Sequence, residues 1–139
     1  MAGIRCVGSM RGGEPRVGTF TVVNDEVIYI GEMLTLSTYE AAKGTTDDAT
    51  FIGVALEYVD NTADGEVVHA ICDPFAIYAY RDGTAHAAGA TLDLGKGSST
   101  GDVLSTNSNA DFTVICNNTA TQDTLFIITP GEHYLHGGG

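Results

Sequence analysis

The sequence predicts an all-β protein, either a barrel or a sandwich. Short runs of alternating or β-branched residues recur along the chain, and clusters of turn-forming residues separate them. The chain has 18 Gly against 3 Pro and no Trp, a composition that suits many tight turns. Only residues 38–43, with Gly44 as a cap, have the composition of a helical turn. Because 139 residues suffice for one hydrophobic core, we expect a compact single domain.

The expected strands can be read in chain order. Residues 17–23 alternate and end at the turn Asn24-Asp25, so we expect them to form a hairpin with 26–30. Residues 50–59 are the strongest strand, and Asp64-Gly65 turns the chain back into 66–72 as a second hairpin. The remaining predicted strands are 31–36, 75–80, 90–94, 102–104, 111–116 and 124–129. This pattern does not predict the strand order.

A Gly-x-x-Leu-x-Leu phrase occurs twice, at residues 31–36 and 89–94. About twenty residues after each copy comes an apolar run that opens on phenylalanine, at 51–56 and at 112–116. Because glycine can turn the chain into a strand whose alternate residues are leucine, this echo predicts two similar β units in one domain. The repeat indicates a scaffold and not a catalytic centre.

Charge and cysteine content exclude several classes of function. The net charge of −12 argues against nucleic acid as a partner, since phosphate binding needs clustered Lys and Arg. No apolar run approaches about 20 residues and the first residues do not resemble a leader, so we expect neither export nor membrane insertion. Cys6, Cys72 and Cys116 form no Cys-x-x-Cys pair, which predicts buried reduced thiols and a reducing site of synthesis.

The basic residues are concentrated at the start of the chain. Arg5, Arg11 and Arg16 supply half of the six basic residues, and residues 10–15 have neither helical nor strand periodicity. Residues 1–16 are therefore predicted to be a flexible basic arm, which is either a frayed terminus or a segment that docks on a partner or sister subunit. This gives a division into an arm (1–16), a β domain (17–130) and a Gly-rich tail (131–139), which pairs at an edge or stays loose.

No motif in the sequence indicates catalysis, a cofactor or a metal. Residues 60–66 resemble the start of a calcium loop, but its twelfth position is Ile71 where a bidentate Glu is needed. The four histidines (His69, His86, His133 and His136) lack the spacing of a helical zinc pair, and we expect the last two to be solvated in the tail. We therefore predict a protein that is not an enzyme and name no catalytic residue.

Four phrases together give the chain a family resemblance: residues 31–36, 51–56, 67–72 and 88–92. With them the chain resembles the capsid decoration, or cement, proteins of tailed bacteriophages. The resemblance implies a β-tulip domain, made in the host cytoplasm, that assembles as a homotrimer on the outer surface of the virion. There it would bind where major capsid subunits meet and stabilise the head. The arm would order on docking, with Arg5, Arg11 and Arg16 as contacts, and no cofactor, nucleic acid or membrane is implied.

Two other classes of function stay open. A carbohydrate- or receptor-binding module at the virion surface would present Tyr29, Tyr58, Tyr78 or Tyr80 on an exposed strand face, whereas the plainer interpretation half-buries them in the sheet. Residues 88–94 also resemble the first motif of the trimeric dUTPases. That family's Arg-Ser-Gly loop and its Gly-x-Ile-Asp-x-x-Tyr segment have no counterpart here, so an enzyme of this type is the weaker alternative.

Overall fold

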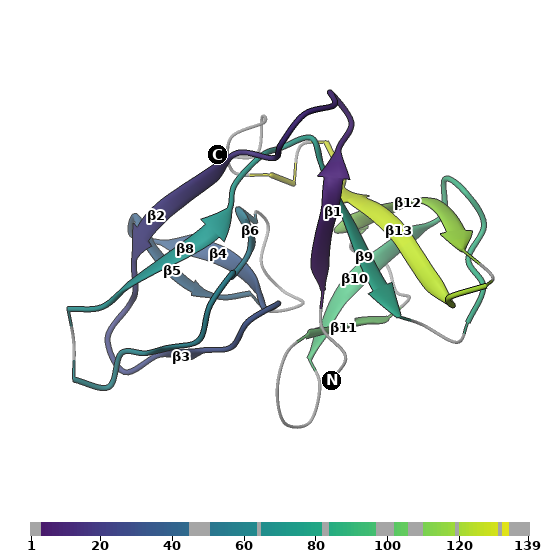
Figure 1. The fold of residues 1–139 in the computed structure, drawn as a ribbon. Helices are drawn as coiled ribbons and strands as arrows, with labels where there is room; N and C mark the ends of the chain where they lie inside the picture. Colours follow the sequence, from purple (N-terminus) through teal and green to yellow (C-terminus); the bar gives the residue numbers. More distant parts are fainter. Residues whose placement is uncertain are drawn as a thin grey trace.

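The computed structural model describes residues 4–44, 51–63, 65–81, 84–96, 102–105, 110–118, 120–130 and 132–133. These residues form strands and connections without a helix, which confirms the all-β class (Figure 1). The strands are β1 (Arg5–Ser9), β2 (Val17–Thr21), β3 (Val27–Ile28), β4 (Met33–Ser37), β5 (Glu40–Lys43), β6 (Gly53–Val54), β7 (Val59–Asp60), β8 (Val67–Ile71), β9 (Ala76–Arg81), β10 (Thr91–Lys96), β11 (Asp102–Ser105), β12 (Phe112–Asn118) and β13 (Asp123–Ile128).

The described strands form one large sheet and three small ones. The large sheet has six strands in the order β1-β9-β13-β12-β10-β11. The small sheets are β5-β4-β6, β2-β8 and β3-β7. The small sheets lie together on one side of Figure 1 and the large sheet lies on the other, with β1 between the two groups. None of these sheets closes into a barrel among the described strands, so the barrel expected from the sequence is not confirmed.

The strand pairing of the first half recurs in the second. The central strand β4 pairs with β5 and β6, and β10 pairs in the same antiparallel way with β11 and β12. The pair β2–β8 corresponds to β9–β13. The bridge between Ala55 and Ala70 in the first half corresponds to the pairing of β12 with β13 in the second. We refer to residues 17–71 as repeat 1 and to residues 76–128 as repeat 2. The two similar β units predicted from the sequence are thus confirmed.

The glycines that open the two Leu-x-Leu phrases hold equivalent positions. Gly31 and Gly89 have φ angles of 85° and 86°, a left-handed conformation that glycine adopts without a steric penalty. The Gly31 amide donates to the carbonyl of Ala55 at 2.9 Å, and the Gly89 amide donates to that of Val114 at 2.8 Å. Each glycine therefore turns the chain into the central strand of its half and bonds to the equivalent neighbouring segment.

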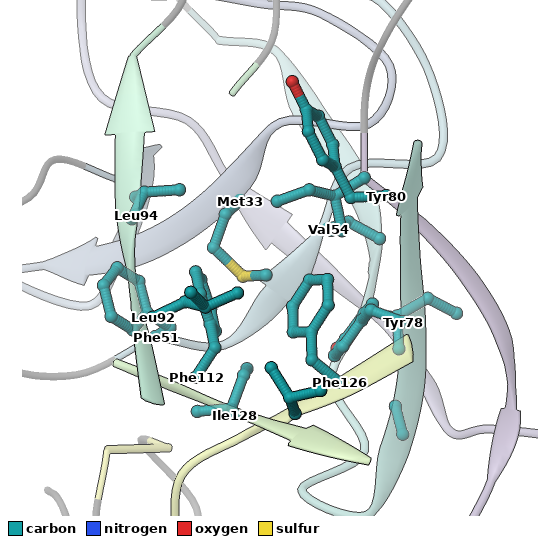
Figure 2. Close-up of a cluster of buried hydrophobic side chains, with 14 residues drawn as sticks. Met33, Phe51, Val54, Tyr78, Tyr80, Leu92, Leu94, Phe112, Phe126 and Ile128 are labelled. Atoms are coloured by element: carbon teal, nitrogen blue, oxygen red, sulfur yellow. The ribbon is translucent and has the colours of Figure 1, made fainter. Parts of the chain in front are cut away.

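Two buried clusters fill the interior, and the larger is shared between the repeats. The smaller lies within repeat 1 and includes Ile28, Leu34 and Val68. The larger is centred on repeat 2, where the rings of Phe112 and Phe126 lie 4.8 Å apart (Figure 2). Its remaining buried members from before repeat 2 are Ile4, Met33, Phe51, Val54 and Ile71. Because repeat 1 contributes side chains to this cluster, the two repeats are packed together as one hydrophobic unit.

Both hairpins predicted in the first half are wrong in their main partners. Strand β2 pairs with β8 and β3 pairs with β7, so residues 17–23 and 26–30 do not pair with each other. Among the described residues of 51–59 and 66–72, the pairing is limited to the bridge between Ala55 and Ala70, with the Leu56 amide donating to the His69 carbonyl. Local alternation predicts that a segment is a strand, but the partner depends on which apolar faces can be buried together.

The helical turn predicted at 38–43 is also wrong. Thr38 and Tyr39 have φ angles of 51° and 69° and form the two-residue turn between β4 and β5. Two central residues with positive φ suit a tight antiparallel hairpin, since this twist matches that of the flanking strands. Ala41, which is fully buried, pairs with Leu36. Burial of Ala41 in the sheet outweighs its helix propensity.

The extended N-terminal arm predicted for residues 1–16 is not confirmed. Residues 5–9 form β1, an edge strand of the large sheet that pairs with β9, and Ile4 is buried in the larger cluster. Two backbone bonds tie down the following segment, from the Met10 amide to Phe75 and from the Cys72 amide to Arg16. Although this segment has little periodicity of its own, the pairing of β1 with β9 orders it.

Candidate functional site

An apolar cleft of about 480 Å³ lies between β1 and repeat 1. Val7 of β1 lines one side, while Ile30 and Leu56 line the other. These three side chains are 50%, 62% and 41% exposed. Val54 and Ile71, which are buried core residues, form part of its lining. Exposed aliphatic side chains gathered around one concave surface indicate a site of interaction with another molecule.

Backbone hydrogen bonds hold the walls of the cleft in place. Gly31 makes two of them: its amide donates to Ala55 at 2.9 Å, and its carbonyl accepts the Ile4 amide at 3.2 Å. The first bond joins the turn that carries Ile30 to the strand that precedes Leu56, and the second joins this turn to β1. The Leu56 amide in turn donates to His69 at 2.9 Å. The cleft is therefore built into the backbone framework.

The three arginines predicted as partner contacts lie in different surroundings. Arg5 lines the cleft, and its guanidinium pairs with the Asp123 carboxylate at 2.7 Å. The Arg11 guanidinium lies 4.0 Å from the centre of the Phe75 ring, a cation–π contact. The Arg16 amide donates to Asp73 at 3.3 Å. The basic segment thus has contacts with the body of the protein, and of the three arginines only Arg5 lines the cleft.

Asp123 is held as a carboxylate. The hydroxyl of Thr121 donates to it at 2.9 Å, and this hydrogen bond is the main cause that lowers the pKa of Asp123, with Arg5 adding to the effect. Burial opposes the shift without reversing it. The ion pair therefore persists at neutral pH and links β1 to β13 across the large sheet.

Sequence reasoning did not identify the cleft. In the sequence, Ile30 ends the expected strand 26–30 and Leu56 lies within the expected strand 50–59, so neither residue is marked as part of a surface site. Val7 lies in the segment that was predicted to be mobile. A signal was present, because Ile30 directly precedes the turn glycine Gly31 and lies beyond the part of the strand that can pair. The convergence of three separate segments, however, follows only from the long-range pairing.

The histidines of the described chain lie in structural or surface positions. His69 pairs with Glu57 at 3.0 Å at the surface, and this hydrogen bond lowers the pKa of Glu57. The prediction that His133 is solvated in the tail is wrong, because His133 is buried and its Nε2 lies 2.9 Å from the carbonyl oxygen of Ile52. His136 lies outside the described residues. Within the described ranges, no three residues of the types His, Cys, Asp and Glu are grouped so as to hold a metal ion.

The segment that resembles a calcium loop has a structural role instead. The side-chain amide of Asn61 donates to the carbonyls of Val22 and Val23 at 2.9 and 2.8 Å, and its oxygen accepts the Glu66 amide at 2.8 Å. The Asn61 side chain is fully buried. A buried amide with three such bonds fastens the turn to the end of β2. This geometry accounts for the polar residue without a cation.

The cysteines follow the predicted pattern in part. All three are free thiols. Cys72 is buried and Cys6 is half-buried, and burial raises the pKa of both thiols. Cys116 is exposed, so its predicted burial is wrong. It lies beyond the bulge that interrupts the pairing of β12 with β13 between Val114 and Cys116, where the alternation of inward and outward residues is broken.

The tyrosines divide into core and surface residues. Tyr78 is fully buried and Tyr80 nearly so, and both belong to the larger cluster. Tyr58 is exposed, and its ring centre lies 5.3 Å from that of Tyr29, which is half-buried. The four tyrosines therefore do not share one exposed face. Of these four, only the Tyr29–Tyr58 pair includes an exposed ring that could contact a ligand.

Comparison with known proteins identifies no relative: no family model matches the chain, and no curated protein matches it in sequence. No helix in the described part of the chain is long and apolar enough to cross a membrane. The interpretation of the cleft as a binding site therefore depends on its geometry alone. It offers apolar surface in a rigid concave setting, with one ion-paired arginine along its lining.

Proposed function

We propose that this protein is a structural component of a virion that binds the outer surface of a bacteriophage capsid where major capsid subunits meet, and stabilises the head. The apolar cleft beside β1 is the observation that carries the proposal, because a rigid apolar surface suits docking on another protein. The sequence resemblance to cement proteins supplies the class of partner. The proposal includes a homotrimer and assigns no enzymatic activity, cofactor, nucleic acid or membrane to the protein.

The charge of the protein fits this role. A net charge of −12 makes free copies repel one another and favours solubility before assembly. The cleft, by contrast, is lined mainly by apolar side chains such as Val7, Ile30 and Leu56, and its two charged residues, Arg5 and Glu14, are of opposite sign. One cleft of this size provides a weak contact. Three such contacts in a trimer would act together, and avidity would raise the overall affinity well above that of one site.

Co-sedimentation with empty phage heads tests the proposal with a matched pair of variants. Leu56 and Val67 are both 41% exposed, but only Leu56 lines the cleft. We expect saturable binding by the natural protein and by Val67→Asp, and at least about tenfold weaker binding by Leu56→Asp, because a carboxylate in an apolar contact must be desolvated. Equal binding by both variants would contradict the role of the cleft. Light scattering on the same samples tests for the trimer.

Deletion of residues 1–16 is a poorer experiment than substitution. It would remove β1 from the large sheet and Ile4 from the larger cluster, so lost binding would not distinguish docking from unfolding. Ile30→Asp avoids this difficulty, since Ile30 is 62% exposed and lies outside the strands. It should weaken head binding as Leu56→Asp does while leaving the thermal unfolding midpoint unchanged.

The Tyr29–Tyr58 pair supports a second candidate, a carbohydrate- or receptor-binding module at the virion surface. Exposed aromatic rings provide rigid amphipathic surfaces that suit such ligands. In this case the natural protein would bind members of a glycan array, and Tyr58→Ala would lose that binding. Glycan binding without any head binding would replace the first proposal by the second.

A further inference from the structure

The two faces of the large sheet differ in what they contact. On the inner face, Tyr78 and Phe126 lie in the larger cluster with Met33 of repeat 1 (Figure 2). Successive side chains of a strand point to opposite faces, so the alternate residues of β9 and β13 point away from repeat 1. The aliphatic residues on this outer face are half-buried and belong to neither cluster: Ile77, Leu125 and Ile127.

The outer face has a surplus of positive charge. The charged residues of β1, β9, β12 and β13 are Arg5, Arg81 and Asp123, in a chain whose net charge is −12. Asp123 pairs in register with Arg81 on the neighbouring strand, but its carboxylate forms its ion pair with Arg5. Arg81 is exposed, and its guanidinium forms no ion pair among the described residues. The outer face therefore combines an apolar centre with one uncompensated arginine.

Repeat 1 has the opposite charge and presents an exposed aromatic side chain. Its sequence contains ten Asp and Glu residues against a single basic residue, Lys43. At the tip of the β4–β5 hairpin, Tyr39 is 81% exposed, more than any other large hydrophobic side chain in the described ranges. Glu40 follows it directly and opens β5. The hairpin tip thus combines an aromatic ring with a carboxylate.

The backbone of this hairpin tip is strained. Thr38 and Tyr39 have φ angles of 51° and 69°, at the two positions where a tight hairpin favours Asn and Gly. A β-branched residue at positive φ is a conformational outlier, and such strain is often kept where a side chain has a function. Aromatic side chains of this kind are typical anchors of protein–protein contacts. Strain and exposure together indicate that Tyr39 contacts another protein.

We propose that the β4–β5 hairpin tip of one copy of this chain docks on the outer face of the large sheet of the next copy. The Tyr39 ring packs against Leu125, and the Glu40 carboxylate pairs with the Arg81 guanidinium. Charge complementarity selects this occupant, because an acidic hairpin meets the positive face of an otherwise acidic protein. The two surfaces lie in different repeats, so the contact is head-to-tail and forms a ring where the rotation between copies closes.

This inference rests on the homotrimer of the proposed function and assigns the interface that forms it. One tyrosine buries about 150–250 Å², well below the roughly 1,200 Å² typical of a stable complex. A single contact is therefore weak, whereas a closed ring holds each copy by two contacts at once. Tyr39, Glu40 and Leu125 do not line the cleft, and neither does Arg81, so the clefts of the assembled copies stay available to a capsid.

Charge reversal on the two sides of the contact tests the pairing, with sedimentation velocity over a range of concentrations as the measurement. Glu40→Arg and Arg81→Glu should each weaken self-association at least about tenfold, because each places like charges opposite one another. The double variant restores an opposite pair and should recover the association. Glu66→Arg makes the same charge change at an exposed position of repeat 1 outside the hairpin, and should associate at least as well as the natural protein. A double variant as weak as the single ones would overturn the proposal.

A relaxed turn distinguishes an anchoring role of Tyr39 from a structural one. Thr38→Asn combined with Tyr39→Gly supplies the residues that positive φ favours, so the thermal midpoint of a dilute sample should rise while self-association weakens at least about tenfold. Tyr58→Ala is the control, since Tyr58 is also exposed but lies outside the hairpin; it should associate like the natural protein. A lower midpoint with unchanged association would assign Tyr39 to the fold and overturn the proposal.

The exposed thiol of Cys116 allows a test by cross-linking. Cys116 pairs with Leu125, so it lies beside the proposed position of the Tyr39 ring. Thr38→Cys keeps Tyr39 and should form disulfides with Cys116 of the next copy under mild oxidation, which gives covalent oligomers larger than a dimer. The same variant in a Cys116→Ser background should lose them. Equal cross-linking with and without Cys116 would overturn the proposal.

The mass of the natural protein separates this inference from the proposed function. A trimer that none of these variants weakens would overturn the hairpin contact and keep the trimer. A monomer at every concentration would overturn both the contact and the trimer. Saturable head binding by such a monomer would still support the capsid role, and would leave a capsid subunit as the occupant of the outer face.

Discussion

Repeat 1 and repeat 2 share their strand pairing but differ in how far one pair extends. In repeat 2, β12 and β13 pair along most of their lengths. In repeat 1 the equivalent pair is reduced to the single bridge between Ala55 and Ala70. The difference centres on Gly53, which pairs with Leu34 in the place where Phe112 pairs with Leu92. The two repeats therefore keep the same strand partners although one has a glycine where the other has a phenylalanine.

Gly53 allows two parts of the chain to approach each other closely. It has a φ of 142°, and a Cβ there would lie 1.8 Å from the carbonyl oxygen of Ile71 and 2.9 Å from the Tyr78 hydroxyl. At this position the backbone of β6 thus lies against the backbone of Ile71 in the same repeat and against the Tyr78 hydroxyl of repeat 2. Phe112, on the other hand, fills the centre of the larger cluster. At this pair of equivalent positions, Gly53 allows a close backbone approach and Phe112 contributes a large buried side chain.

Gly53→Ala should have the largest effect, because it introduces both a clash with backbone and a strained φ. We expect a loss of about 4 kcal/mol in the free energy of unfolding. Gly65→Ala is the control: it has a φ of 89° but open space around it, and should lose only about 1 kcal/mol. Urea denaturation measures both. Equal losses would mean that the close approach at Gly53 contributes nothing.

Equivalent leucines test whether the repeats unfold together. Leu34 lies in the smaller cluster and Leu92 in the larger, and both are at most 1% exposed. Leu34→Ala and Leu92→Ala should each cost about 3 kcal/mol. Because repeat 1 contributes Met33 and Phe51 to the larger cluster, each variant should keep a single transition by calorimetry and circular dichroism. Two separate transitions in either variant would show that the repeats are independent units.

Tyr78→Phe should act in the opposite direction. The Tyr78 hydroxyl is buried without a hydrogen-bond partner among the described residues, and burial raises its pKa well above the usual value. Removing a polar atom that lost its water on folding should stabilise the protein by about 1 kcal/mol. Tyr58→Phe, at an exposed position, should change the unfolding free energy by close to zero. A destabilised Tyr78→Phe protein would reveal a partner for this hydroxyl.

The smallest effect is expected at the ion pair that links β1 to repeat 2. The folded pKa of Asp123 is lowered, so its contribution is present above the unfolded value of about 3.8 and is lost as the pH falls through the folded pKa. Asp123→Asn should therefore be slightly less stable than the natural protein at pH 7 and equal to it at the acid end. Thermal midpoints between pH 2 and pH 7 measure this, and a constant difference across that range would contradict it.

Sequence reasoning recovered the local features of the fold far better than its long-range ones. The strands of repeat 2 and the two glycine-led phrases were predicted because they depend on alternation and on turn residues. The pairing of β2 with β8 was not, since these strands lie about fifty residues apart and nothing local marks them as partners. The cleft was missed for the same reason, because Val7, Ile30 and Leu56 come together only after the long-range pairing forms.

The strand β1 lies outside both repeats, and this has a consequence for the order of folding. Arg5 pairs with Ala79, and the Arg5 side chain pairs with Asp123. Strand β1 is therefore synthesised before its partners, and it cannot make these contacts until β9 and Asp123 have been made. Pairing across such sequence separations is slow, since a long loop has to close first. The cleft that β1 lines is accordingly complete only after β9 has been made and has paired with β1.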